Sequence, residues 1–194
     1  MMIKIFTLFF LLASIQSQAS EKSVYEVISN NDNLSEFHKY LKFTGLDSIL
    51  KKKLPWGWTV FAPNNSAFKE FKEKNNSILE KKFLIKNLIM DHILIGRKSS
   101  QNLGEIMVTE KTVSNKPLQL YKTSEIHVKD MIVIKEDISA VNGIVHSIGC
   151  VMYVQPSSED PRLTKEEKEK FAITSCCMRE KKEVNAWKSS IKAR

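Results

Sequence analysis

The sequence predicts an α+β fold, with helices in the first half of the chain and strands in the second. Apolar residues between positions 23 and 92 recur mostly at the spacing of helix faces. After Gly96 this period disappears, and the pairs Ile126/Val128 and Ile132/Ile134 alternate as residues do in strands. Helices that are separated along the chain from a mostly antiparallel sheet are typical of the α+β class.

Residues 1–19 predict a signal peptide that is cleaved after Ala19. Lys4 precedes an apolar run, and Ser17 and Ala19 place small residues at the two positions that a signal peptidase inspects. An uncleaved anchor is the alternative, but the apolar run is short for a spanning helix, which needs about 20 residues. We therefore expect a secreted or periplasmic protein.

Two stretches carry the helical pattern. The first runs from Ser23 to Leu50 and is broken at polar and glycine positions, so we expect several short helices there. The second runs from Ser77 to His92 and places Leu84, Leu88 and His92 on one face.

The segment WTVFAPNNSAF predicts a buried strand that ends at a proline and continues directly into a helix. Thr59 and Phe61 belong to a run of strand-forming residues, and Pro63 ends that run because proline cannot donate to a ladder. Asn64 is a helix-capping type, and Phe68 begins the apolar face of the helix.

The segment KEDISAVNGIVH predicts two strands joined by a tight turn. The pair Asn142-Gly143 is a strong turn signal between apolar runs because it favours positive backbone φ angles. His146 lies among apolar residues of the second strand, where a histidine more often makes one internal hydrogen bond than it acts in chemistry.

These two segments, in this order, resemble the two signatures of the fasciclin (FAS1) domain family. Between them, Leu84 to Gly96 resembles the family's central helix and the strand that follows it. The resemblance covers roughly residues 21–156 and implies a β-wedge of mostly antiparallel strands with helices packed around it. We therefore expect a signal peptide at 1–19, a fasciclin-like domain at 20–156 and a charged, partly helical extension at 157–194.

The resemblance implies adhesion rather than catalysis. In some animal members an Asp-Ile pair before the second signature and a Tyr-His segment are implicated in receptor binding. By residue match, these positions are Asp137 and Ile138 in the first case and His92 in the second. Asp91 replaces the tyrosine, which puts binding through His92 in doubt. A structural role for Asp137 is the alternative, because an Asp before a turn frequently bonds backbone amides.

No catalytic residue, metal site or cofactor is predicted. The histidines are His38, His92, His127 and His146, and none has a second ligand at metal-binding spacing. The sequence has no nucleophile elbow, phosphate-binding glycine loop or HExxH pattern.

The three cysteines predict little. Cys150 lies in an apolar strand and is expected to be buried and inert, so the fold should not depend on a disulfide. Cys176 and Cys177 are adjacent, and a strained vicinal disulfide between them is disfavoured. The odd number leaves room for an intermolecular bridge. The sequons at Asn33 and Asn75, like that at Asn64, matter only if the source organism glycosylates them.

The C-terminal extension predicts a basic helix with a narrow apolar stripe formed by Val184, Trp187 and Ile191. Two interpretations stay open. The stripe could lie on an anionic membrane or in a partner's groove. Alternatively, the helix could place Trp187 against the domain.

Charge and export together restrict the class of partner. The formal net charge is +8, which favours anionic polysaccharide, lipid head groups or acidic protein surfaces. Nucleic acid fits poorly because no recognition motif is present. We expect an exported adhesion or envelope-interaction protein that binds a cell-surface or envelope protein or an anionic glycan. A soluble periplasmic stress or folding factor and an anionic carbohydrate-binding protein are the alternatives, and the oligomeric state is left open.

Overall fold

The computed structural model describes residues 21–129, 131–154, 177 and 181–191. The expected signal peptide and residues 157–176 of the expected extension lie outside these ranges. The helices are α1 (Val24–Ser29), the 3₁₀ helix η1 (Asp32–Leu34), α2 (Ser35–Thr44), α3 (Asp47–Leu50), α4 (Asn65–Leu79), α5 (Lys82–Asp91) and α7 (Lys181–Ser190). The strands are β1 (Trp58–Pro63), β2 (Ile93–Ile95), β3 (Val108–Lys111), β4 (Pro117–Lys122), β5 (Ile126–Val128), β6 (Met131–Ala140) and β7 (Gly143–Ile148).

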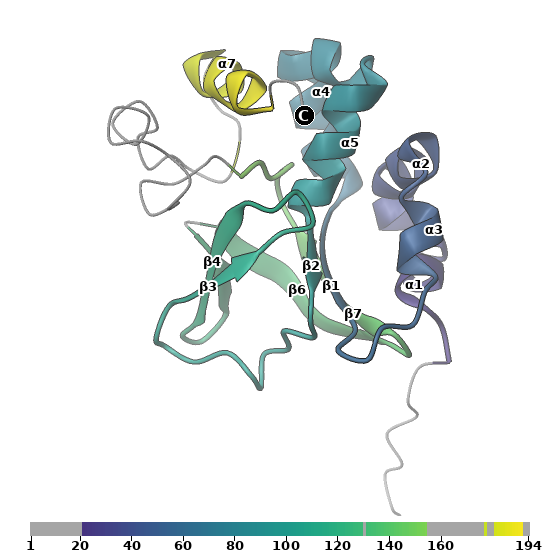
Figure 1. Ribbon diagram of the computed structural model, residues 1–194, viewed down its shortest axis with the longest axis vertical. Coiled ribbons are helices and arrows are strands. Elements are labelled where there is room, and N and C mark those ends of the chain that lie inside the picture. The colour runs from purple at the N-terminus through teal and green to yellow at the C-terminus, as the bar shows by residue number, and fades with distance from the viewer. Residues whose placement is uncertain (1–20, 130, 155–176, 178–180, 192–194) are drawn as a thin grey trace, which may run out of the picture.

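One seven-stranded sheet organises the molecule, in the order β2-β1-β7-β6-β5-β4-β3. Among these strands only β1 and β7 run parallel, with Trp58 opposite Gly143. An antiparallel bridge between Leu94 and Thr112 connects the two ends of the sheet, so that it curls almost into a barrel. The helices gather on one side, and β3 and β4 lie away from α1, α2 and α3 (Figure 1). The predicted α+β class is confirmed.

Two apolar clusters fill the described part of the chain. The larger packs the helices against the sheet and includes Phe37, Trp58 and Phe68. The smaller lies among the strands and includes Phe61 and Leu120. This division means that neighbouring residues of β1 stabilise both clusters, because successive side chains of a strand point to opposite faces.

The predicted passage from β1 into α4 is confirmed. All six residues of β1 are buried, as expected for a strand between two neighbours. The side-chain oxygen of Asn64 accepts a hydrogen bond from the Ala67 amide at 2.8 Å and caps α4. The Asn64 amide in turn donates to the Ile148 carbonyl at 3.0 Å, which joins the helix start to β7.

The turn at Asn142-Gly143 is confirmed, but positive φ angles are not the reason that asparagine and glycine occupy it. Neither residue is among those with positive φ. A Cβ atom on Gly143 would lie 2.3 Å from the Trp58 carbonyl oxygen, so only glycine lets β1 approach this closely. The Asn142 side chain accepts from the Val24 amide at 2.7 Å and donates to the Leu50 carbonyl at 2.8 Å. The pair thus fastens the turn to the helices.

The described part of the C-terminal extension packs against the domain. The three residues of the stripe are buried and belong to the larger cluster, with exposed fractions of 7% for Val184, 0% for Trp187 and 8% for Ile191. The second interpretation of the stripe is therefore the observed one. This corrects the membrane interpretation of the tail, because the apolar side chains that it requires face the core.

A disulfide between Cys150 and Cys177 corrects the prediction that Cys150 is an inert thiol. The two Cα atoms lie 5.8 Å apart although 27 positions separate them in the chain. The prediction was wrong because pairing depends on how the extension returns to the sheet, which spacing in the sequence does not reveal. Cys176 lies outside the described residues.

Candidate functional site

The residues predicted to bind a partner do not form one surface. Asp137 and Ile138 lie in β6, and His92 follows the last turn of α5. Ile138 is half-buried and packs against the larger cluster. His92 is fully buried. The β6 pair and His92 therefore belong to different parts of the fold.

Asp137 has a structural role in β6. Its φ of 57° falls in the left-handed region, which Asp and Asn tolerate better than most residues. It lies where the register between β6 and β7 shifts, as at a β-bulge. Its carboxylate accepts a hydrogen bond from the Ser100 amide at 3.0 Å and another from the Ser100 hydroxyl. The side chain thereby holds the loop that follows β2.

His146 completes the same arrangement. Its Nδ1 accepts from the Asp137 amide at 3.2 Å, so its Nε2 carries the proton and donates to the Lys98 carbonyl at 2.8 Å. The ring stacks on Phe61, with centroids 5.2 Å apart. Burial lowers the pKa of His146, which keeps the ring neutral. The expected internal hydrogen bond is present, together with a second one.

His92 is satisfied inside the fold in a similar way. Its Nδ1–H donates to the Leu88 carbonyl at 2.8 Å, and its Nε2 accepts from the Met152 amide at 2.9 Å. Burial lowers the pKa of His92 to about 4. Since the ring has no exposed surface, it offers no contact to a partner in this conformation.

Asp91 is the residue whose role sequence reasoning missed. Its side chain is fully buried, and a buried carboxylate is stable only with partners. Oδ2 accepts from the Trp187 indole at 3.0 Å, from the Val154 amide at 2.9 Å and from the Lys116 ammonium at 3.0 Å. Oδ1 accepts from the Ser114 hydroxyl. We call these five residues the Asp91 cluster.

The Asp91 cluster holds α7 against the domain, because Trp187 of α7 donates to Asp91 of α5. The Lys116 ammonium also lies 5.4 Å from the Trp187 ring centroid, over its face. The carboxylate and the ammonium thus both contact a tryptophan of the C-terminal extension. Asp91 and Trp187 are 96 positions apart, so the sequence alone does not indicate that their side chains are in contact.

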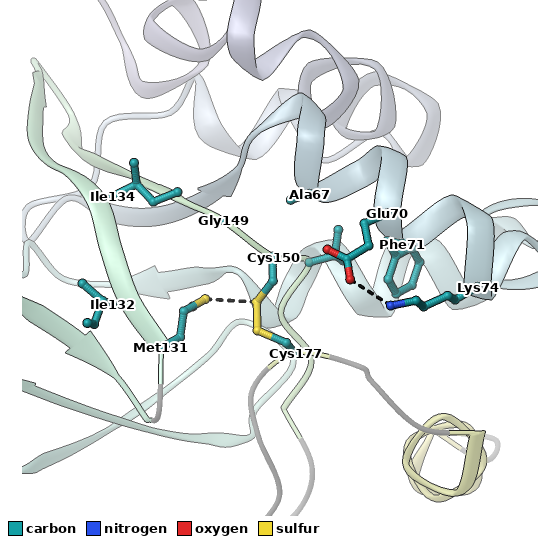
Figure 2. Close-up of a pocket in the computed structure, with 11 residues that line it drawn as sticks. Ala67, Glu70, Phe71, Lys74, Met131, Ile132, Ile134, Gly149, Cys150 and Cys177 are labelled. Atoms are coloured by element: carbon teal, nitrogen blue, oxygen red, sulfur yellow. Dashed lines mark hydrogen bonds and ion pairs between the residues drawn. A yellow bond between two sulfur atoms is a disulfide. The ribbon is translucent and has the colours of Figure 1, made fainter.

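A hollow lies between β6 and α4 on the surface of the described residues (Figure 2). It encloses about 270 Å³. It is lined by Ala67, Glu70, Phe71, Lys74, Met131, Ile132, Ile134, Gly149, Cys150, Val151 and Cys177. We call it the β6–α4 hollow.

Two outward isoleucines dominate the β6–α4 hollow. Ile132 and Ile134 are 48% and 62% exposed, whereas Met131 and Val133 on the same strand face inward. Gly149 leaves room beside them, because a Cβ there would lie 2.9 Å from the Ile134 Cδ1. All four residues from 131 to 134 are apolar, so alternation could predict a strand but not which pair faces outward.

Sulfur and charge complete the walls of the hollow. The Cys150–Cys177 disulfide lies at its side, with the Met131 sulfur 3.1 Å from the Cys150 sulfur (Figure 2). Cys150 has no thiol proton, so this is a contact between sulfur atoms and not a hydrogen bond. The Lys74 ammonium pairs with the Glu70 carboxylate at 2.8 Å. The hollow therefore combines apolar and sulfur-containing walls with one ion pair.

Within the described ranges, no group of three or more His, Cys, Asp or Glu side chains is placed to hold a metal ion. No described helix combines the length and the apolar character that crossing a membrane requires.

Comparisons with known proteins agree with this architecture. Human periostin is 27% identical over an alignment of 140 residues that covers 69% of this chain and 16% of periostin. A solved FAS1 domain pair from the insect cell adhesion molecule Fasciclin I is similar in fold, with a TM-score of 0.52 and 23% identity. That match covers 66% of this chain and 47% of the solved chain, so the present chain spans less than two thirds of either relative.

The family model named Fasciclin domain matches residues 32–154. This range begins at η1 and ends after β7, and so contains the whole sheet. Both signature segments and the β6 side of the hollow lie inside it. The chain belongs to the fasciclin domain family.

Proposed function

We propose that the protein is an exported adhesion or envelope-interaction module that binds a protein partner through the β6–α4 hollow. The observation that carries the proposal is the outward pair Ile132 and Ile134 beside an open hollow. Strand positions that face water are normally polar, because apolar side chains gain free energy by burial. We interpret this exposed pair, together with the hollow beside it, as the site of interaction.

The size of the hollow favours a partner's side chain over a free ligand. Small-molecule pockets usually enclose about 300–1,000 Å³, and this hollow encloses about 270 Å³. One aliphatic or aromatic anchor of a protein surface fits such a volume. Anchors of this type contribute most of the affinity in many interfaces.

Two further observations support export and adhesion. The Cys150–Cys177 disulfide is a feature of proteins in oxidising compartments, in agreement with the expected signal peptide. The insect relative is a cell adhesion molecule. We extend that role to this chain as part of the proposal.

The loop at Asp137 is a second candidate surface for the same function. Asp137 and Ile138 are half-buried, and Ser139 beside them is exposed. A partner could contact this segment, although the Asp137 carboxylate is engaged with Ser100. We favour the hollow because its apolar side chains are more exposed.

The test is saturable binding of residues 20–194 to intact cells or envelope material of the source organism. Ile134→Asp should weaken binding by about tenfold or more, because it places a charge in an apolar contact. Ile106→Asp is the matched control, since Ile106 is 84% exposed and does not line the hollow. Unchanged thermal melts should accompany both variants.

The other outcomes separate the alternatives. If Asp137→Ala abolishes binding and Ile134→Asp does not, the loop at Asp137 is the adhesive site. Loss of binding in high salt with both variants unaffected favours an anionic carbohydrate partner. Absence of any saturable binding favours the soluble periplasmic factor and contradicts the adhesion proposal.

A further inference from the structure

Helices α2 and α5 pack against each other and present basic and aromatic residues to solvent. The exposed residues of this surface are Lys39, Lys42 and Phe43 on α2 and Lys82, Phe83 and Lys86 on α5. We call it the α2–α5 face. We propose that the α2–α5 face docks onto a bilayer that contains anionic phospholipid.

The helical repeat gathers these side chains. Lys39 and Phe43 are four residues apart on α2, so they lie on one face of that helix. Lys82 and Lys86 have the same spacing on α5. The Lys82 ammonium lies 5.7 Å from the Phe43 ring centroid, which shows that the two rows meet.

The α2–α5 face carries a net positive charge. Four lysines stand against Glu36, whose carboxylate lies 3.7 Å from the Lys39 ammonium. Glu80 and Lys81, just before α5, are both exposed and offset each other. A cluster of lysines with so few carboxylates attracts an anionic surface.

The two phenylalanines decide which anionic surface fits. Phe43 is 45% exposed and Phe83 is 54% exposed. Phenylalanine beside lysine is the composition of surfaces that enter the boundary between head groups and acyl chains. A polysaccharide offers no apolar phase for these rings, so the lysines alone would suffice to bind it. The combination therefore favours a lipid bilayer.

The α2–α5 face is already formed in the folded protein without a membrane. Leu41, Leu88 and Ile89 on the opposite sides of the two helices are completely buried, which fixes both helices to the domain. Docking would thus require no folding of the segment, and the entropic cost of binding is reduced. This inference is independent of the β6–α4 hollow, which shares no residue with the face.

The test is co-sedimentation of residues 20–194 with vesicles at low salt. We expect binding to mixed phosphatidylcholine and phosphatidylglycerol vesicles and none to phosphatidylcholine alone. Combining Lys42→Glu with Lys82→Glu should weaken binding by about tenfold or more, because each lysine contributes to attraction near the surface. Combining Lys69→Glu with Lys72→Glu gives the same charge change on α4 and should have a much smaller effect.

The aromatic contribution is tested separately. Phe43→Ser combined with Phe83→Ser should lower vesicle affinity about tenfold, whereas Ile106→Ser, an exposed apolar site outside the face, should leave it unchanged. Thermal melts of all variants establish that they are folded.

Three results would overturn the proposal. The first is failure to bind any anionic vesicle, and the second is an equal loss in the α4 control. The third is binding to a soluble anionic polysaccharide that depends on the lysines, with vesicle affinity insensitive to the phenylalanines. Ile134→Asp should leave vesicle binding intact, so failure of the hollow proposal can be distinguished from failure of this one.

Discussion

The two signature segments and the two exposed surfaces are built in opposite ways. Thr59, Phe61, Asn142 and His146 are almost completely buried, and their polar atoms bond within the fold. The β6–α4 hollow exposes Ile132 and Ile134, and the α2–α5 face exposes lysines and phenylalanines. In this chain the signature residues thus stabilise the domain, whereas the surfaces proposed for binding are formed mainly by other residues.

The largest expected effect tests the buried side of this comparison. Gly143→Ala should lower the free energy of unfolding by about 4 kcal/mol or more, because the new Cβ meets backbone that cannot move aside. Gly104→Ala is the control, since nothing lies within 4 Å of its Cβ position. Urea denaturation measures both, and equal stability of the two variants would contradict the close approach of β1 to this turn.

A similarly large effect is expected in the Asp91 cluster. Asp91→Asn should destabilise the protein by about 3–4 kcal/mol, because Lys116 is left as a buried charge without its counter-charge. Adding Lys116→Met should restore about half of the loss or more. Urea denaturation and limited proteolysis at α7 would follow the change. An additive loss in the double variant would show that the ion pair does not anchor the helix.

Acid stability tests the buried histidines. The pKa of His92 falls from 6.5 to about 4 on burial, so below pH about 6.5 the unfolded chain takes up the proton first. Above pH about 6.5 His92 is neutral in both states and costs no stability. As the pH falls toward 4, protonation of the unfolded chain lowers the free energy of unfolding by roughly 3 kcal/mol. The lowered pKa of His146 acts in the same direction.

The measurement is the free energy of unfolding between pH 4 and 7, for the wild type and for His92→Gln. The variant should show a weaker pH dependence, because glutamine does not titrate. The same slope in both proteins would mean that His92 is not buried in the neutral form.

The smallest effects on stability are expected at the exposed surfaces. Ile134→Asp and Phe83→Ser should each change the free energy of unfolding by less than about 0.5 kcal/mol, while weakening binding in their respective assays. Phe71→Ala, in the wall of the hollow but only 5% exposed, should instead cost about 3 kcal/mol or more. If the exposed variants unfold as easily as Phe71→Ala, the surfaces are part of the core and the comparison fails.

Local chemistry explains why much of the fold could be predicted. Pro63 and Asn64 act within a few residues of their own position, so the strand, its end and the helix cap were all recognisable. The turn at Asn142-Gly143 was also recognisable, although the reason for its glycine was not. That reason is the approach of β1, which a local pattern does not contain.

The candidate sites depended on information that the sequence does not hold. The run from Met131 to Ile134 is apolar at every position, so the sequence did not show which side chains face outward, and the structure shows that Ile132 and Ile134 do. Cys150 bonds to Cys177, and Asp91 contacts Trp187, because the C-terminal extension returns to the sheet. Contacts between such distant segments are set by tertiary packing, and composition gives no indication of them.

The bond between Cys150 and Cys177 closes the intervening chain into a covalent ring. A protease that cuts this ring once cannot release α7, because the sulfur bridge still attaches the C-terminal piece to the sheet. We expect the bridge to keep Trp187 near Asp91 and Cys177 in the wall of the hollow after such a cut. Covalent separation of the two pieces requires a reductant as well as the cut, so the protein remains one molecule after a single cleavage there.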